Sequence, residues 1–272
     1  MRVRGKIAIV VILVTGAVAG FAYGLGTSKH GSTHEADTWS VSVKMTTSSG
    51  TGITGRAYKL SVATPEFSGI ADARAMRAVN AMFQDRTRKE IDGLTTATDQ
   101  NPPTDDFDGN APFTLTESVA IQRIGRIAAV AFSGDEYIGG AHGFPLAESV
   151  LIRTDTWTAI PADQSFLATA GTAEGATKLA GVIAPSIKGA PGDSCHTDAA
   201  SLLAGGPSSS GTVTPDSFEH SMVVGLWPGG VEFIFSPYRL WAFGCGQGIA
   251  RVPFSALDGL INPGIVRLAT SS

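Results

Sequence analysis

The sequence of 272 residues is poor in the residue types that build metal and redox sites. It has two cysteines and five histidines, and no C-x-x-C spacing occurs. His30 and His34 stand four residues apart, but they lie in a short polar segment where no helix is expected. A zinc site needs paired ligands at regular spacing. The sequence therefore predicts neither a metal site nor a cofactor.

Charge is also scarce. Only 16% of the residues are charged, the formal net charge is −4, and no basic stripe occurs. Proteins that bind nucleic acid concentrate lysine and arginine on one face, so this composition excludes a nucleic-acid partner.

Motifs for nucleophilic catalysis are missing. No G-x-S-x-G occurs, and Gly192-Asp193-Ser194 is followed by Cys195 where a serine-protease motif needs glycine. A serine hydrolase requires a nucleophile, a base and an orienting carboxylate. No such set can be assigned, and we name no catalytic residue.

The N-terminus carries a long uncharged run. Residues 1–6 form a short basic stub with Arg2, Arg4 and Lys6, and residues 7–26 contain no charge. Twenty helical residues span about 30 Å, the thickness of a hydrocarbon core, and flanking basic residues stay inside. We expect a single-pass membrane anchor with the rest of the chain outside. The alternative is a signal peptide cleaved near Ala19, which would release a secreted protein.

Two features accompany this segment. Gly16, Gly20 and Gly24 recur every fourth residue, a spacing that lets two membrane helices pack closely as a dimer. Residues 27–37 are small and polar, which is typical of a flexible tether.

Export changes the meaning of the cysteines. An even cysteine count in an exported protein favours a disulfide, so we predict a bond between Cys195 and Cys245. Closing a loop of about 50 residues stabilises the fold by roughly 4 kcal/mol in the chain-entropy description.

The remaining chain alternates between strand and helix patterns without regularity. Apolar residues alternate from Trp39 and from Tyr58, which predicts strands; Pro65 should end the second one. A helix is expected from an N-cap at Ser68 to Gly93, with Val79, Phe83 and Leu94 among its apolar stripe and the charge run 85–90 on its solvated face.

Further strands are expected at 114–122, 126–132, 148–156, 222–226, 231–235 and 249–254, with a helical stretch at 164–187. The irregular order indicates an α+β fold with an antiparallel or mixed sheet and packed helices, preceded by one N-terminal transmembrane or signal helix. We divide the exported part into an N-terminal α+β part, residues 38–112, and a C-terminal domain, residues 113–272.

Two loops carry the candidate binding residues. The loop 137–143 contains Tyr137, Gly139, Gly140 and His142, and the loop 236–246 contains Tyr238 and Trp241. Glycines let a partner approach the backbone, and aromatic side chains add contact area at low entropic cost. The alternative is structural: His142 would hydrogen-bond within a turn, and the aromatic residues would pack in the core.

The order of several short motifs resembles a known family. Gly139-Gly-Ala-His-Gly143, Asp155-Thr-Trp157, Val231-Glu-Phe-Ile-Phe235 with Pro237-Tyr238, and Val252-Pro-Phe-Ser-Ala-Leu257 are similar to the extracytoplasmic domain of RsiV-type, lysozyme-sensing anti-sigma factors. A secreted mycobacterial immunogenic antigen has the same C-terminal domain. The resemblance covers residues 113–260 and implies an α+β domain without established catalysis, which in one branch binds lysozyme.

This sequence departs from that branch at its N-terminus. Only residues 1–6 could lie inside the cell, too few to hold a sigma factor. We therefore expect an exported cell-envelope binding module that recognises a lysozyme-like protein or a cell-wall polymer, without a sigma-factor-binding domain. The alternative is a cell-wall-modifying enzyme, such as a polysaccharide deacetylase or esterase.

Overall fold

The computed structural model describes residues 10–12, 39–104, 110–161, 164, 172–188, 222–235 and 247–271. Strand β1, Val10–Ile12, pairs with the strand that begins at Ser40. The rest of the predicted membrane segment, including Ala19 and the three spaced glycines, lies outside the described residues, as do the tether 27–37, Cys195, Cys245, Tyr238 and Trp241. Among the described helices, none is long and apolar enough to cross a membrane.

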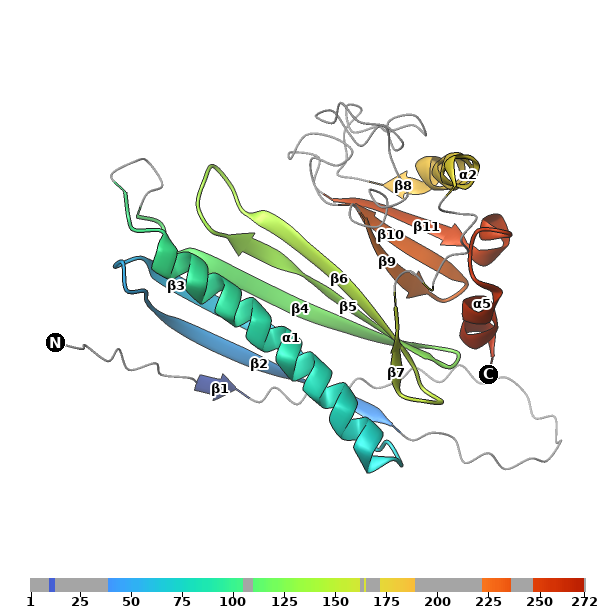
Figure 1. Ribbon diagram of the computed structural model, residues 1–272, viewed down its shortest axis with the longest axis horizontal. Helices are drawn as coiled ribbons and strands as arrows, with labels where there is room; N and C mark the ends of the chain where they lie inside the picture. The colour runs from blue at the N-terminus through green and yellow to red at the C-terminus, as the bar shows by residue number, and fades with distance from the viewer. Residues whose placement is uncertain are drawn as a thin grey trace.

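The larger of two sheets runs through the first 160 residues (Figure 1). Its strands lie in sequence order, and every pair is antiparallel except β3 with β4, which are parallel and joined by helix α1. The sheet is therefore mixed, which confirms the predicted α+β class. It continues across the predicted boundary at residue 112, because Tyr58 pairs with Phe113. The strands are β2 Ser40–Thr51, β3 Ala57–Ser68, β4 Phe113–Ile124, β5 Ile127–Tyr137, β6 Phe144–Arg153 and β7 Thr158–Ile160.

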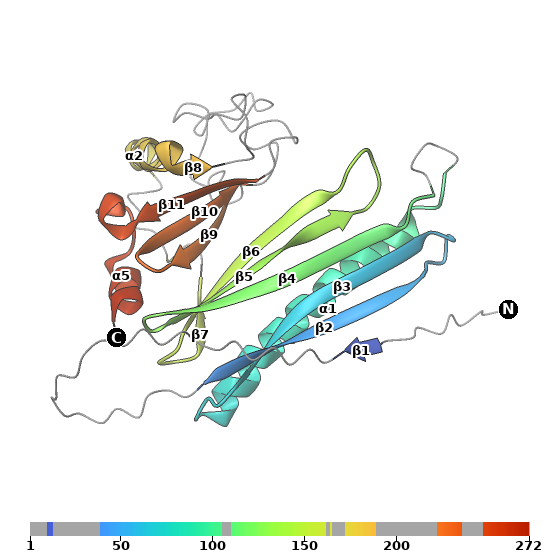
Figure 2. The same ribbon diagram turned by 180° about the vertical axis from the view of Figure 1, so that it is seen from behind.

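Helix α1, Ala73–Gln100, covers one face of this sheet along its length (Figures 1 and 2). Val79, Phe83 and Leu94 are buried on its inner side, as the apolar stripe predicts. The predicted ends were wrong. Asp72 is the N-cap, since its carboxylate accepts hydrogen bonds from the first turn, and the helix continues through Gly93 because Leu94 beyond it is fully buried.

Pro65 does not end its strand, contrary to the sequence-based expectation. Strand β3 continues to Ser68, and β2 pairs with it along its whole length. Strand β4 pairs with β3 only from Tyr58 to Ser61. At Pro65 the strand is therefore an edge on that side, and an edge tolerates a residue without an N–H.

An aromatic cluster fills the space between α1 and the sheet. The ring centroid of Phe67 lies 5.8 Å from that of Phe83 and 5.9 Å from that of Trp157. Trp39 packs edge-on against Trp157, with 5.6 Å between their ring centroids. Trp157 stands in the turn between β6 and β7 with φ of 56°, and it is the one non-glycine residue with positive φ in the described part of the chain. Packing of the indole ring thus holds the backbone in a conformation that L-residues avoid.

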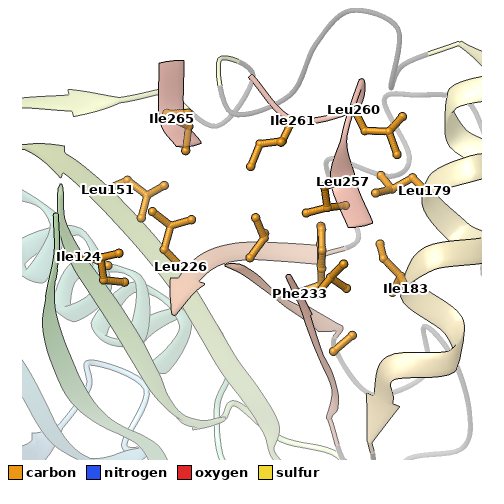
Figure 3. Packing of buried hydrophobic residues seen from close by; sticks show 14 of the residues in the cluster. Ile124, Leu151, Leu179, Ile183, Leu226, Phe233, Leu257, Leu260, Ile261 and Ile265 are labelled. Atoms are coloured by element: carbon orange, nitrogen blue, oxygen red, sulfur yellow. The ribbon is translucent and has the colours of Figure 1, made fainter. Parts of the chain in front are cut away.

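The second sheet is smaller and has the order β8-β11-β10-β9. Strands β9, β10 and β11 lie where the sequence predicts strands, and they form a sheet that is separate from the first one. Figure 3 shows their core, where Phe233 packs with Leu179, Ile183 and Leu257. The elements are α2 Ala173–Ile183, η3 Ala184–Ser186, β8 Ile187–Lys188, β9 Met222–Trp227, β10 Gly230–Phe235, β11 Gly248–Pro253, η5 Phe254–Leu257 and α5 Pro263–Thr270.

This second core joins the first sheet on the face opposite α1. Ile124 and Leu151, from β4 and β6, belong to the same cluster as Leu226 of β9 and Ile265 of α5 (Figure 3). The contact lies toward the β4–β5 turn, and it leaves the other end of that face to polar side chains.

Candidate functional site

A crevice of about 510 Å³ occupies the polar end of the face opposite α1. Successive side chains along a strand point to opposite faces of the sheet. In β4, Glu117 points toward α1, so its neighbours Thr116 and Ser118 point away from α1. Gln247, which immediately precedes β11 of the second sheet, also contributes to it. The crevice is lined by Ser61, Thr116, Glu117, Ser118, Ser133, Gly134, Asp135, Pro145 and Gln247.

Hydroxyl groups and one carboxylate dominate this lining. The Ser118 and Ser133 hydroxyls lie 3.1 Å apart, because the two residues pair directly across β4 and β5. The side-chain nitrogen of Gln247 is buried and has no hydrogen-bond partner among the described residues. A buried amide without a partner costs about 1–3 kcal/mol, and a ligand that accepts its hydrogen bond removes that cost.

The hairpin loop between β5 and β6 extends from the same strands. The Tyr137 hydroxyl donates to the Gly140 carbonyl at 3.1 Å, and the ring meets Phe113 edge-on. Gly139 and Gly140 have φ of 106° and 92°, values that require glycine. The two glycines therefore serve the turn itself.

Two contacts of His142 are defined. Its Nδ1 lies 3.1 Å from the Gly143 carbonyl oxygen, and its ring packs edge-on against Phe144. Near it, Ile138 and Phe144 are 39% and 46% exposed. The loop thus presents apolar side chains to solvent around a histidine.

None of the candidate binding residues in the described part of the loops lines the crevice, but two residues next to those loops in the sequence do. Pro145 follows the first loop, residues 137–143, and lines the crevice. Gln247 follows the second loop, residues 236–246, and lines it from the other side. Phe235 pairs with Gly248, which brings the two ends of the second loop together. The sequence did not indicate Thr116, Ser118, Ser133 or Asp135, because isolated hydroxyl residues on strands carry no local signal.

A buried ion network lies on the other face, under α1. Arg86 donates to both carboxylate oxygens of Glu117, at 2.9 and 2.6 Å, and to Glu148 at 2.6 Å, while its guanidinium lies 3.6 Å from the centroid of the Phe132 ring. The prediction that the run 85–90 is a solvated face was therefore wrong for Arg86. That residue follows Val79 by seven positions and Phe83 by three, so it shares their buried stripe.

Burial raises the pKa of Glu117, and the paired guanidinium of Arg86 opposes this by stabilising the carboxylate. Glu136, further along the same face, also has a raised pKa, caused by burial and by the negative charge of Glu90. No group of three or more histidine, cysteine, aspartate or glutamate residues able to hold a metal occurs in the described chain.

Glu136→Gln should stabilise the protein at about pH 7. In the folded state, the pKa of Glu136 lies above its ordinary value of about 4. The contribution of Glu136 to the free energy of unfolding is therefore fully present below about pH 4. It is lost as the pH rises through the raised folded-state pKa. The neutral amide avoids this loss. Urea unfolding should show a more stable variant at pH 7 and equal stabilities near pH 3. Glu66→Gln, at an exposed position of β3, is the control; a pH-independent effect of Glu136→Gln would contradict the assignment.

Several solved structures resemble this chain, among them two of the DUF3298 family. One is a member of the DUF3298 family from Bacteroides fragilis, with a TM-score of 0.60, 14% identity, and coverage of 87% of this chain and 99% of that one. The other is a DUF3298 family protein from Pseudomonas aeruginosa, with a TM-score of 0.47, 12% identity, and coverage of 83% and 96%. No protein-family model and no curated protein matches the sequence.

The first likeness establishes the fold. Almost the whole of the Bacteroides fragilis chain is covered, so the α+β architecture described above is that of a solved DUF3298 protein. At 14% identity the likeness carries the fold and no activity.

Proposed function

We propose that this chain is a non-catalytic binding module of the cell envelope, related to the extracytoplasmic domain of RsiV-type proteins. The observation that carries the proposal is the crevice, whose lining includes Gln247 and Pro145, the latter close to the loop 137–143 that the sequence singled out. In the proposal, residues 7–26 hold the module on the outer side of the membrane, with residues 10–12 in the bilayer instead of paired with β2, or cleavage near Ala19 releases it.

A protein ligand is the preferred partner. The loop beside the crevice exposes Ile138 and Phe144 next to His142, and apolar side chains presented around polar groups are typical of protein interfaces. Tyr137 is held by the Gly140 carbonyl and by Phe113, so little ordering cost would fall on binding. A lysozyme-like protein is the partner that the motif resemblance suggests.

A cell-wall glycan is the second candidate. The lining of the crevice offers hydroxyls from Ser118 and Ser133, the Asp135 carboxylate and the unpaired Gln247 amide, and these groups match the hydroxyls of a sugar.

The test measures binding of the full-length chain to lysozyme by biolayer interferometry and to insoluble peptidoglycan by sedimentation. Asp135→Lys should weaken binding at least about tenfold, since it places a cation in the crevice. Asp85→Lys makes the same charge change on the exposed face of α1 and should leave binding intact. Ile138→Asp should weaken lysozyme binding and spare peptidoglycan. If Asp135→Lys and Asp85→Lys bind alike, the crevice is not the ligand site.

A further inference from the structure

A second cavity, of about 400 Å³, lies at the opposite end of strands β5 and β6 from the loop 137–143. Three elements border it: the β4–β5 turn, the end of β6, and the last turn of α5. Each of them supplies one arginine. The lining residues are Arg126, Arg153, Asp155, Gly264, Arg267, Leu268 and Ser271.

Main-chain hydrogen bonds hold the three elements together. The Arg126 amide donates to the Leu268 carbonyl at 2.8 Å, and the Arg126 carbonyl accepts from the Thr154 amide at 2.9 Å. Gly125 permits this approach, since its φ is 56° and a Cβ there would lie 2.3 Å from the Leu268 oxygen. The arginine positions are therefore fixed by backbone contacts that do not involve the guanidinium groups.

The cavity has an excess of positive charge. Arg153 forms a two-point ion pair with Asp155, at 3.0 and 2.8 Å. Hydrogen bonding from Arg153 is the main cause of the lowered pKa of Asp155, and the positive charge of Arg126 lowers this pKa further. Arg126 and Arg267 make no ion pair with any described residue. The lining thus holds three arginines and one carboxylate, in a chain whose net charge is −4.

We propose that this cavity binds a phosphate-type oxyanion. Arg126 and Arg267 would bind it directly, and Arg153 would supply the third guanidinium. A guanidinium offers paired N–H donors that match two oxygens of such a group, and three guanidiniums from separate elements suit a tetrahedral anion better than a planar carboxylate. The phosphate is either free phosphate or a phosphodiester within an envelope polymer. The site is remote from the crevice, so it stands independently of the proposed function.

The experiment uses the full-length chain and three probes: inorganic phosphate, a poly(glycerol phosphate), and acetate. Binding is measured by isothermal titration calorimetry, with the shift in melting temperature as a second readout. Phosphate or the polymer should bind, and acetate should bind at least about tenfold more weakly than either. Tighter binding of the polymer identifies the phosphodiester source, and tighter binding of inorganic phosphate identifies the free anion; both support the site.

The variants Arg126→Gln and Arg267→Gln should each weaken phosphate binding about tenfold or more, since each removes a charged hydrogen-bond donor. The backbone bonds of residue 126 remain, so Arg126→Gln should fold normally. Arg88→Gln removes an equal charge from an exposed pair on α1 and is the matched control. Equal affinities in wild type and both cavity variants, no binding of either phosphate probe, or acetate binding as tight as phosphate would each overturn the proposal.

Discussion

Glu117→Ala is expected to lower the free energy of unfolding by about 3–5 kcal/mol. The Glu117 side chain is 1% exposed and that of Arg86 is 13% exposed, so the substitution leaves a buried guanidinium without its two-point partner. Glu148 still reaches Arg86, but through one hydrogen bond and from a side chain that is 45% exposed. Urea unfolding at neutral pH measures the loss.

A double variant separates charge from packing. Arg86→Met with Glu117→Leu removes both charges, fills a similar volume and should recover most of the loss, because buried ion pairs are often replaced by apolar residues at little cost. The control is Asp85→Ala, which breaks an ion pair with Arg88 whose partners are 60% and 66% exposed and should cost less than about 1 kcal/mol. If Glu117→Ala costs no more than Asp85→Ala, the network is not a stabilising element.

Trp157→Ala should destabilise the protein by about 3 kcal/mol, and Trp157→Gly by about 1 kcal/mol less. Both variants lose the ring contacts with Trp39 and Phe67. Only glycine relieves the strain of a φ of 56°. This ranking reverses the usual one, in which glycine is the more damaging replacement. Thermal or urea unfolding of both variants measures the difference.

Phe67 provides the matched comparison. It packs in the same aromatic cluster, but it lies within strand β3, where the backbone is extended. Phe67→Gly should therefore be worse than Phe67→Ala by roughly 0.5–1 kcal/mol. If glycine destabilises the protein more than alanine at residue 157 as well as at residue 67, the backbone at Trp157 is not strained.

Much of the fold follows from local patterns. Alternation indicates the strands around Tyr58 and Phe233, and the apolar stripe indicates the buried face of α1. The errors arise where tertiary contacts decide. Ser68 looks like an N-cap, yet it is the last residue of β3 and its hydroxyl lies 2.8 Å from that of Ser40. Arg86 looks solvated because it stands in a charge run, and only its partners on β4 and β6 explain its burial.

The candidate site divides in the same way. Glycines and aromatics make the loop 137–143 visible in the sequence, because turn chemistry is local. The crevice depends on which strands pair, for example Thr116 with Asp135, and on how β11 places Gln247. The arginine cavity is harder still to predict, since its arginines lie as much as 141 positions apart, from 126 to 267. No short stretch of the sequence contains all three arginines, so local patterns cannot reveal this site.

The parallel pairing of β3 with β4 has a consequence for the order of folding. Strands β2 and β3 form one hairpin, and β4 to β7 form a meander, so each unit closes through short-range contacts. In the described chain, the strands of the two units pair with each other only at Tyr58–Ser61 against Phe113–Thr116, across the 28 residues of α1. Joining the two units requires closing that connection, which lowers the chain entropy before any contact between the units stabilises the sheet. We therefore expect α1 to dock before the sheet becomes continuous, and substitutions on its buried stripe to slow folding more than substitutions within either hairpin unit.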